Sequence, residues 1–240
     1  MAYIYYTTDK SKSLYHDALF LLGIDRSDTT TYPLEDFIRN ANSWYRKANT
    51  WIWQSTGEWE YDDSNYTTLP IATTKLEAGQ NDYELPSDAQ KVDRIEVLNA
   101  SGDYEHIKTI DKSQISGALS EYYETDGMPK YYDLVGRSII LYPAPSATET
   151  TLAAGLKIYF TRDIEEFETD DTNKEPGFVS DFHRLISLGA ALDFALVTGS
   201  NKINFIREQI QLMEADLKQF YGSRQREAKV MIKKNRRLHS

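Results

Sequence analysis

The sequence predicts an α+β protein, in which N- and C-terminal helices form a helical bundle that carries an inserted antiparallel β-sandwich or barrel-like domain. Two long stretches, residues 34–54 and 176–221, have apolar residues at spacings of three and four, which is typical of helices. The tyrosine-rich block between them contains short apolar runs that are typical of strands. This order predicts four regions: an N-terminal arm and first bundle helix (1–56), the inserted β domain (57–165), the C-terminal bundle helices (166–223) and a basic tail, flexible until bound (224–240).

The first helical stretch begins after Pro33, a residue that suits the first turn of a helix. The spacing places its apolar residues on a single face. They are Leu34, Phe37, Ile38, Ala41, Trp44, Tyr45, Ala48 and Ile52.

The C-terminal stretch predicts two helices. The first is expected to begin at Pro176 and to end at Gly199, and the second to run from about Asn201 to Gly222. Because only a short link separates them, they are expected to form an antiparallel hairpin against which the first bundle helix packs.

The middle block predicts six strands, because its apolar and aromatic runs are bounded by Gly and Pro. A turn at Gly136 between two such runs is its best hairpin signal. Several short strands at this spacing are typical of a small antiparallel sandwich or barrel. The expected strands are 83–85, 92–98, 104–110, 131–135, 138–142 and 156–160.

Composition excludes several classes of protein. The absence of cysteine excludes disulfides and thiol chemistry, which is compatible with synthesis in a host cytoplasm. The mean hydropathy of -0.57 is typical of a globular protein, and no apolar run approaches the length of a membrane span or of a signal-peptide core. We therefore expect no membrane partner.

Catalytic and cofactor motifs are also absent from the sequence. The four histidines are far apart along the chain, no glycine-rich nucleotide loop occurs, and the adjacent acidic pairs cannot act as a facing acid and base. We therefore expect no enzyme activity, no cofactor and no metal site. The histidines are His16, His106, His183 and His239.

Charge is distributed unevenly along the chain. Residues 224–240 contain seven of the 27 Lys and Arg and one of the 37 Asp and Glu, which leaves 20 basic and 36 acidic residues before Arg224. An acidic body therefore carries a basic tail. The tail is either a solvated terminus or a segment that orders on an acidic partner surface or a phosphate backbone. Its apolar residues favour contact with protein: Val230, Met231, Ile232 and Leu238.

The chain is rich in aromatic residues, with 17 Tyr, 4 Trp and 9 Phe. Trp51 and Trp53 lie two positions apart and cannot share one helical face, so one is expected in the core and the other at a boundary or exposed to a partner. Buried rings could equally well seal the joint between the domains. We predict contacts with a neighbouring subunit or tail protein at Trp51, Trp53, Tyr131 and Tyr132.

Five segments carry a resemblance to a known family through their order along the chain. They are NDYELPSD at 81–88 with the following strand 92–97, GMPKYY at 127–132, IILYPAP at 139–145, LKIYF at 156–160 and FHRLI at 182–186. Over about residues 44–221 this order resembles the tailed-bacteriophage head-to-tail adaptors, also called connector or tail tubular protein A-like proteins.

The resemblance implies a structural virion protein at the portal vertex between capsid and tail. Copies would form a ring, typically a dodecamer, that docks under the portal protein, extends the DNA channel and provides a platform for the next tail or nozzle protein. An acidic body would let DNA pass without tight binding. The resemblance also implies that the tail reaches the portal, through Arg224, Arg226, Lys229, Val230, Met231, Ile232, Lys233, Lys234, Arg236, Arg237 and Leu238.

Two other functions are compatible with the sequence. The basic tail could bind nucleic acid, which predicts a steep salt dependence of affinity. Alternatively, tyrosines of the β block could stack on sugar rings, although adjacent tyrosines on a strand face opposite ways and only half could line one groove.

Overall fold

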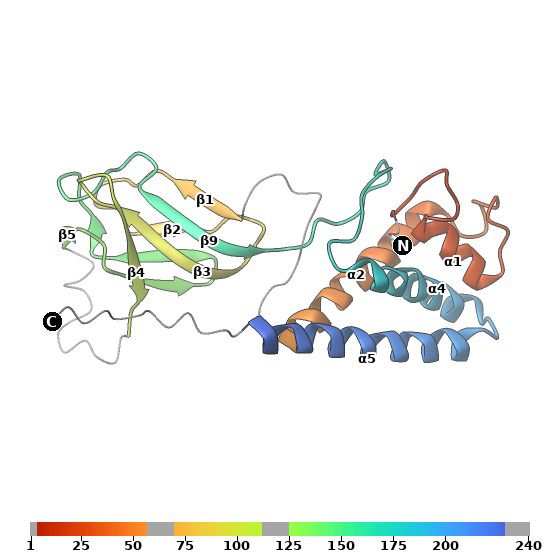
Figure 1. Cartoon of the computed structure of the whole chain (residues 1–240). Coiled ribbons are helices and arrows are strands. Elements are labelled where there is room, and N and C mark those ends of the chain that lie inside the picture. The colour runs from red at the N-terminus through yellow and green to blue at the C-terminus, as the bar shows by residue number, and fades with distance from the viewer. Residues whose placement is uncertain (1–3, 57–69, 112–124, 229–240) are drawn as a thin grey trace. The chain divides into compact units, whose positions relative to one another are not determined.

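The computed structural model describes residues 4–56, 70–111 and 125–228, and it is an α+β structure (Figure 1). The chain divides into two compact units. The α unit comprises Met1–Thr67 and Ile164–Ser240, and the β unit comprises Thr68–Asp163. Two segments of chain that flank the β unit in sequence therefore form one unit.

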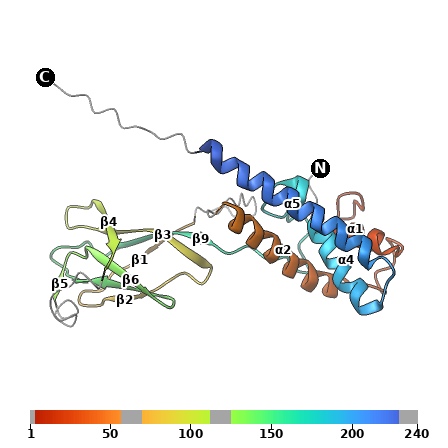
Figure 2. The ribbon, with the colours of Figure 1, turned by 90° about the horizontal axis from the view of Figure 1, so that it is seen from below.

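The α unit contains four α-helices and one short 3-10 helix within its described residues. Figure 2 shows α2 and α5 side by side, and α4 contacts α1, α2 and α5. The elements are α1 (Leu14–Leu22), α2 (Leu34–Thr56), the 3-10 helix η2 (Ser180–Phe182), α4 (Arg184–Thr198) and α5 (Ile203–Ala228).

The core of the α unit is built from the predicted face of α2 together with apolar residues of α1, α4 and α5. Gly189 on α4 lets the helix approach the Trp44 ring closely, because a Cβ atom at this position would lie 2.0 Å from the ring. The Trp44 indole N–H also donates to Asp193 Oδ2 at 2.9 Å, which fixes the ring against α4. Burial of these faces supplies the main driving force for assembling the helices.

Two of the predicted ends of the C-terminal helices differ in the structure, and one agrees. No α-helix begins at Pro176: the Gly177 N–H donates to the Tyr45 hydroxyl at 2.7 Å, the 3-10 helix η2 follows, and α4 begins only at Arg184. Gly199 ends α4 as predicted, with a left-handed φ of 68°. Gly222 does not end α5, which continues to Ala228. Its φ is not among the positive values, so it provides no left-handed cap.

Helix α1 was not predicted from the sequence. Its cap residues are those of an ordinary helix, since the Ser13 side chain accepts from the His16 N–H and Gly23 has a left-handed φ of 75°. Most of its residues are buried, including the polar His16 and Asp17. A helix buried on nearly all sides shows no amphipathic stripe, and this explains the missing periodicity.

The β unit contains a curled seven-stranded sheet with the order β1-β9-β3-β4-β6-β7-β2. A separate pair, β5 and β8, forms a two-stranded sheet. The strands are β1 (Ile71–Thr74), β2 (Asp82–Glu84), β3 (Ala89–Leu98), β4 (Tyr104–Thr109), β5 (Asp126–Gly127), β6 (Tyr131–Val135), β7 (Ser138–Tyr142), β8 (Ala144–Pro145) and β9 (Leu156–Arg162).

The core of the β unit lies on the inner face of this sheet. The alternation of side chains along each strand places apolar residues on that face. Its fully buried members are Leu76, Ile95, Val97, Ile139, Leu141 and Leu156.

The sheet is mixed, so the expectation of a purely antiparallel domain is wrong in this detail. Strands β4 and β6 pair in parallel, with Lys108 opposite Tyr131 and Thr109 opposite Tyr132. The chain between them is long enough to return to the same end of the sheet, which a parallel pair requires. The β6–β7 hairpin is antiparallel, and Gly136 provides its turn with a φ of 63°.

Candidate functional site

Within residues 4–56, 70–111 and 125–228, no cluster of three or more His, Cys, Asp or Glu could hold a metal ion. His183 has a structural contact, since its Nε2 lies 2.7 Å from the Phe178 carbonyl oxygen. No helix in these ranges has the length and apolarity needed to span a membrane. We take the surfaces of the two units as the candidate sites.

The end of α5 leads into the basic tail. Tyr221 is fully buried, and its hydroxyl accepts from the Val179 N–H at 3.1 Å. One residue later, a Cβ atom at Gly222 would lie 3.7 Å from the Ser55 carbonyl oxygen of α2. Ser223 is exposed, and the helical backbone continues beyond it. Tyr221 and Gly222 thus lie against the bundle directly before the basic sequence begins.

The predicted portal contacts fall on both sides of the last described residue. Arg224 and Arg226 belong to the helical backbone of α5. The others lie outside the described residues: Lys229, Val230, Met231, Ile232, Lys233, Lys234, Arg236, Arg237 and Leu238.

The two tryptophans predicted as contacts lie in different environments on α2. Trp51 is 8% exposed and packs edge-on against Trp44, with 6.2 Å between ring centroids. The Nζ atoms of Lys47 and Lys218 lie 5.2 and 5.5 Å from the Trp51 ring centroid, within cation–π range. Trp53 is only half-buried. Trp51 therefore belongs to the core of the α unit, and Trp53 keeps exposed surface.

We expect Trp51→Ala to reduce the free energy of unfolding of the α unit by about 3–5 kcal/mol, the usual cost of truncating a core tryptophan. Trp53→Ala, at the half-buried position on the same helix, should cost only about 1 kcal/mol. Urea denaturation followed by far-UV circular dichroism measures both. Equal losses for the two variants would contradict the assignment of Trp51 alone to the core.

The two predicted tyrosines of β6 also differ in exposure. Tyr132 is 9% exposed and belongs to the core of the β unit, whereas Tyr131 is 43% exposed. Tyr131 lines an open cavity of about 540 Å³, beside Asp126, Lys130 and Glu149. Glu149 Oε2 also accepts from the Met128 N–H at 2.7 Å, which holds one wall of the cavity. Tyr131 is thus the member of the pair with surface available to a partner.

The sequence reasoning missed an exposed apolar surface on the α4–α5 hairpin. Val197 is 88% exposed, and Phe205 and Leu212 are 58% and 56% exposed. Phe205 and Leu212 lie seven residues apart on α5, and this spacing places them on one outer face. A second apolar spacing, separate from the buried stripe of Ile206, Ile210 and Leu217, was the signal in the sequence.

His16 of α1 is buried, and its pKa differs from that of a free imidazole. Its side chain packs on Tyr6 and Tyr15, with ring centroids 5.8 and 5.4 Å away. Burial lowers the pKa of His16, and the positive charges of Lys10 and Arg26 lower it further. Within the described residues its Nδ1 has no hydrogen-bond partner, so the site favours the neutral ring.

Because the folded state lowers the His16 pKa, His16 contributes stability above its unfolded pKa of about 6.5 and loses that contribution as pH falls through the folded pKa. We therefore expect the α unit to be less stable at pH 5 than at pH 7.5, and His16→Gln to reduce this difference. Urea midpoints at the two pH values test the expectation. His106→Gln, at an exposed position on β4, should leave the difference unchanged.

Comparisons with known proteins were made with the whole sequence of the chain. A search of curated proteins finds no similar sequence. A family model described as SU10 adaptor protein matches residues 12–237, which cover both units, α5 and most of the basic tail. This match confirms the resemblance to phage head-to-tail adaptors that the order of motifs indicated. The chain therefore belongs to the SU10 adaptor protein family.

Proposed function

We propose that this protein is the repeating subunit of a phage adaptor ring. The ring docks under the portal protein, extends the DNA channel and provides the platform for the next tail or nozzle protein. A dodecamer is the proposed assembly, located in the virion at the portal vertex after synthesis in the host cytoplasm. The family match over residues 12–237 is the observation that supports this role, and the role is structural rather than enzymatic.

The proposed portal contact is the continuation of α5. The helix packs on the bundle at Tyr221 and Gly222 and continues into a segment with seven basic residues. Positive charge steers association with an acidic partner, and interspersed aliphatic residues supply the buried anchors that a stable contact requires. This combination of charge and apolar residues fits a protein surface better than a phosphate backbone.

Side contacts between copies are proposed at the exposed apolar face of the α4–α5 hairpin. Phe205 and Leu212 on one face of α5, with the exposed Val197 near the end of α4, are unfavourable in water and typical of an interaction surface. A repeated contact between two different faces of the subunit closes into a ring when the rotation between neighbours divides a full turn. Trp53 and Tyr131 are further proposed contacts, with a neighbour or with the next tail protein.

The DNA channel is proposed to bind DNA weakly. Residues before Arg224 carry 20 basic and 36 acidic side chains, so the body of each subunit repels phosphate on balance. Phosphate contacts repeated in every copy would add up and hold the genome in place.

Cosedimentation with emptied capsids tests the proposed role. The purified chain should pellet with capsids that carry portals. It should stay in the supernatant with capsids that lack the portal and are otherwise identical. Equal pelleting with both kinds of capsid, or with neither, would contradict portal docking.

A further inference from the structure

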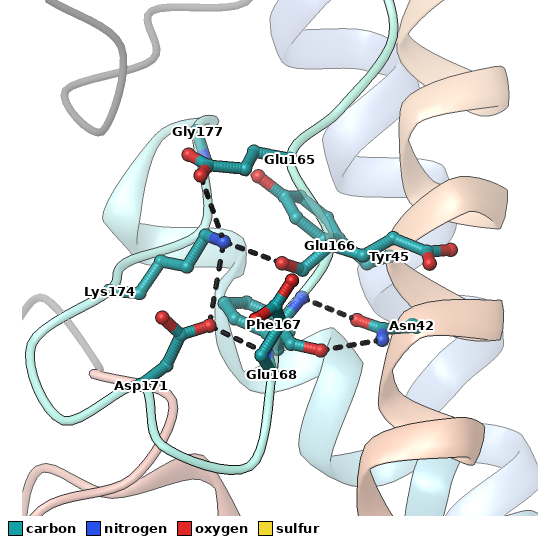
Figure 3. A network of polar contacts seen from close by, with 9 residues as sticks. All are labelled: Asn42, Tyr45, Glu165, Glu166, Phe167, Glu168, Asp171, Lys174 and Gly177. Carbon is teal, nitrogen blue, oxygen red and sulfur yellow. Dashed lines mark hydrogen bonds and ion pairs between the residues drawn. The ribbon is translucent and has the colours of Figure 1, made fainter.

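The chain enters the α unit after β9 through a segment that we call the strap, residues 164–179. The strap contains no helix or strand, so its backbone groups need partners other than those of regular structure. Figure 3 shows that side chains of α2 and of the strap itself supply many of these partners.

The side chain of Asn42 on α2 forms hydrogen bonds with the backbone of the strap. The Asn42 Nδ2 donates to the Phe167 carbonyl oxygen at 3.0 Å, and the Phe167 N–H donates to Asn42 Oδ1 at 2.9 Å (Figure 3). The Phe167 ring is 2% exposed and stacks between Tyr5 and Tyr45, with centroid distances of 4.7 and 5.0 Å. Both the main chain and the side chain of Phe167 are therefore fixed within the α unit.

The buried ammonium group of Lys174 links several residues of the strap to one another. Lys174 is 9% exposed, and its Nζ lies 3.3 Å from Glu165 Oε1, 3.4 Å from Asp171 Oδ2 and 2.5 Å from the Glu166 carbonyl oxygen (Figure 3). A buried ammonium group is stable only when it is paired in this way. The Lys174 carbonyl oxygen also accepts from the Tyr5 N–H at 2.9 Å. These contacts tie both ends of the loop 165–174 to the α unit.

The fixed region reaches the first residue of the strap. Ile164 is 5% exposed and belongs to the core cluster of the α unit. On the preceding side, Arg162 still pairs with Ala89 in the sheet, and the Asp163 N–H donates to the Asp88 carbonyl oxygen at 2.7 Å. Only one peptide linkage, Asp163–Ile164, therefore separates backbone held in one unit from a side chain buried in the other.

We infer that the strap is a fixed part of the α unit. Movement of the β unit on this connection is then confined to the backbone torsions of Asp163 and Ile164, which we call the pivot. The Asn42 contacts keep the pivot at these two residues. A pivot of two residues restricts the directions available to the β unit far more than a linker of the strap's full length would. Releasing the Asn42 contacts would free the first residues of the strap to move as well, and the pivot would become longer. This inference does not depend on the adaptor role.

The absence of cysteine allows a direct test of the pivot, because two cysteines can be introduced without background labelling. Spin labels at Thr50→Cys on α2 and Glu105→Cys on β4, both exposed positions, report the distribution of distances between the units. Hydrogen exchange of the Phe167 amide reports whether the strap remains bound to Asn42.

In the labelled chain, Asn42→Ala should broaden the distance distribution and speed Phe167 amide exchange by about tenfold, since the amide loses its acceptor. Asn42→Asp keeps an acceptor for this N–H but cannot donate to the carbonyl, so it should give an intermediate broadening. Ser43→Ala, an exposed neighbour on α2, should change neither measurement. An unchanged distribution in Asn42→Ala, despite faster Phe167 exchange, would overturn the assignment of the pivot. Unchanged exchange in both Asn42 variants would overturn the role of Asn42.

Discussion

Replacing Gly189 by alanine should reduce the free energy of unfolding of the α unit by about 3 kcal/mol, the upper range for overpacking a core. The added Cβ atom would lie 2.0 and 2.2 Å from two ring atoms of Trp44. The indole cannot move aside easily, because it is 7% exposed and hydrogen-bonded to Asp193. Equilibrium urea denaturation followed by tryptophan fluorescence measures the loss.

Gly222→Ala provides the matched control within another helix of the same unit. A Cβ atom there would lie 3.7 Å from its nearest neighbour, the Ser55 carbonyl oxygen, which is an ordinary contact. Alanine also favours the helix over glycine, so this variant should be as stable as the original chain or more stable by about 0.5–1 kcal/mol. A Gly189→Ala variant as stable as Gly222→Ala would contradict the described packing of Trp44 on α4.

Truncation after Ser223 should weaken binding to the portal by about 100-fold or more, because losing several paired charges costs a few kcal/mol and each 1.4 kcal/mol is tenfold in affinity. The fold should survive, since Tyr221 remains and its hydroxyl still accepts from Val179. Surface plasmon resonance with immobilised portal measures the affinity. Circular dichroism and the urea midpoint of the truncated chain measure the fold.

A charge variant separates the effect of the charges from the effect of chain length. Replacing Arg224 and Arg226 by Gln keeps the length of the chain, so any loss of affinity belongs to the two charges. If the tail serves nucleic acid instead, truncation would remove a salt-dependent affinity for DNA and leave portal binding intact. That result would replace the portal assignment by the alternative function.

The sequence predicted the elements whose signals are local. The bounds of β6 and β7 agree with the expectation because alternating residues and Gly136 define both strands and their turn. Helix α2 was predicted because one apolar stripe runs along its length, and it extends only two residues beyond the predicted end. In both cases the pattern along the chain is the physical cause of the structure.

Features set by distant contacts could not be predicted. Asn42 and Phe167 lie 125 residues apart, and nothing in either segment indicates that an amide will pair with that backbone. The same limit applies to the parallel pairing of β4 with β6. Pro176 and the apolar residues after it have the pattern of a helix start. In the structure they belong to the strap, where the Gly177 N–H donates to Tyr45, and α4 begins only at Arg184.

Part of the candidate site was also predictable. The family and the basic tail followed from the order of motifs and from the charges, whereas the apolar face of α5 was hidden behind its stronger buried stripe. Exposure decided between the paired aromatic residues. Trp51 and Trp53 are the same type of residue and lie close together in the sequence. Their exposure differs only because the fold places different neighbours beside them.

Cryo-electron microscopy of emptied, portal-bearing capsids mixed with an excess of the purified chain tests the adaptor role most directly. The account predicts a ring of added density under the portal, with a helix continuous with α5 that carries residues 224–240 to the portal surface. Bare portals in the presence of folded protein, or a ring whose C-terminal helices point away from the portal, would contradict it.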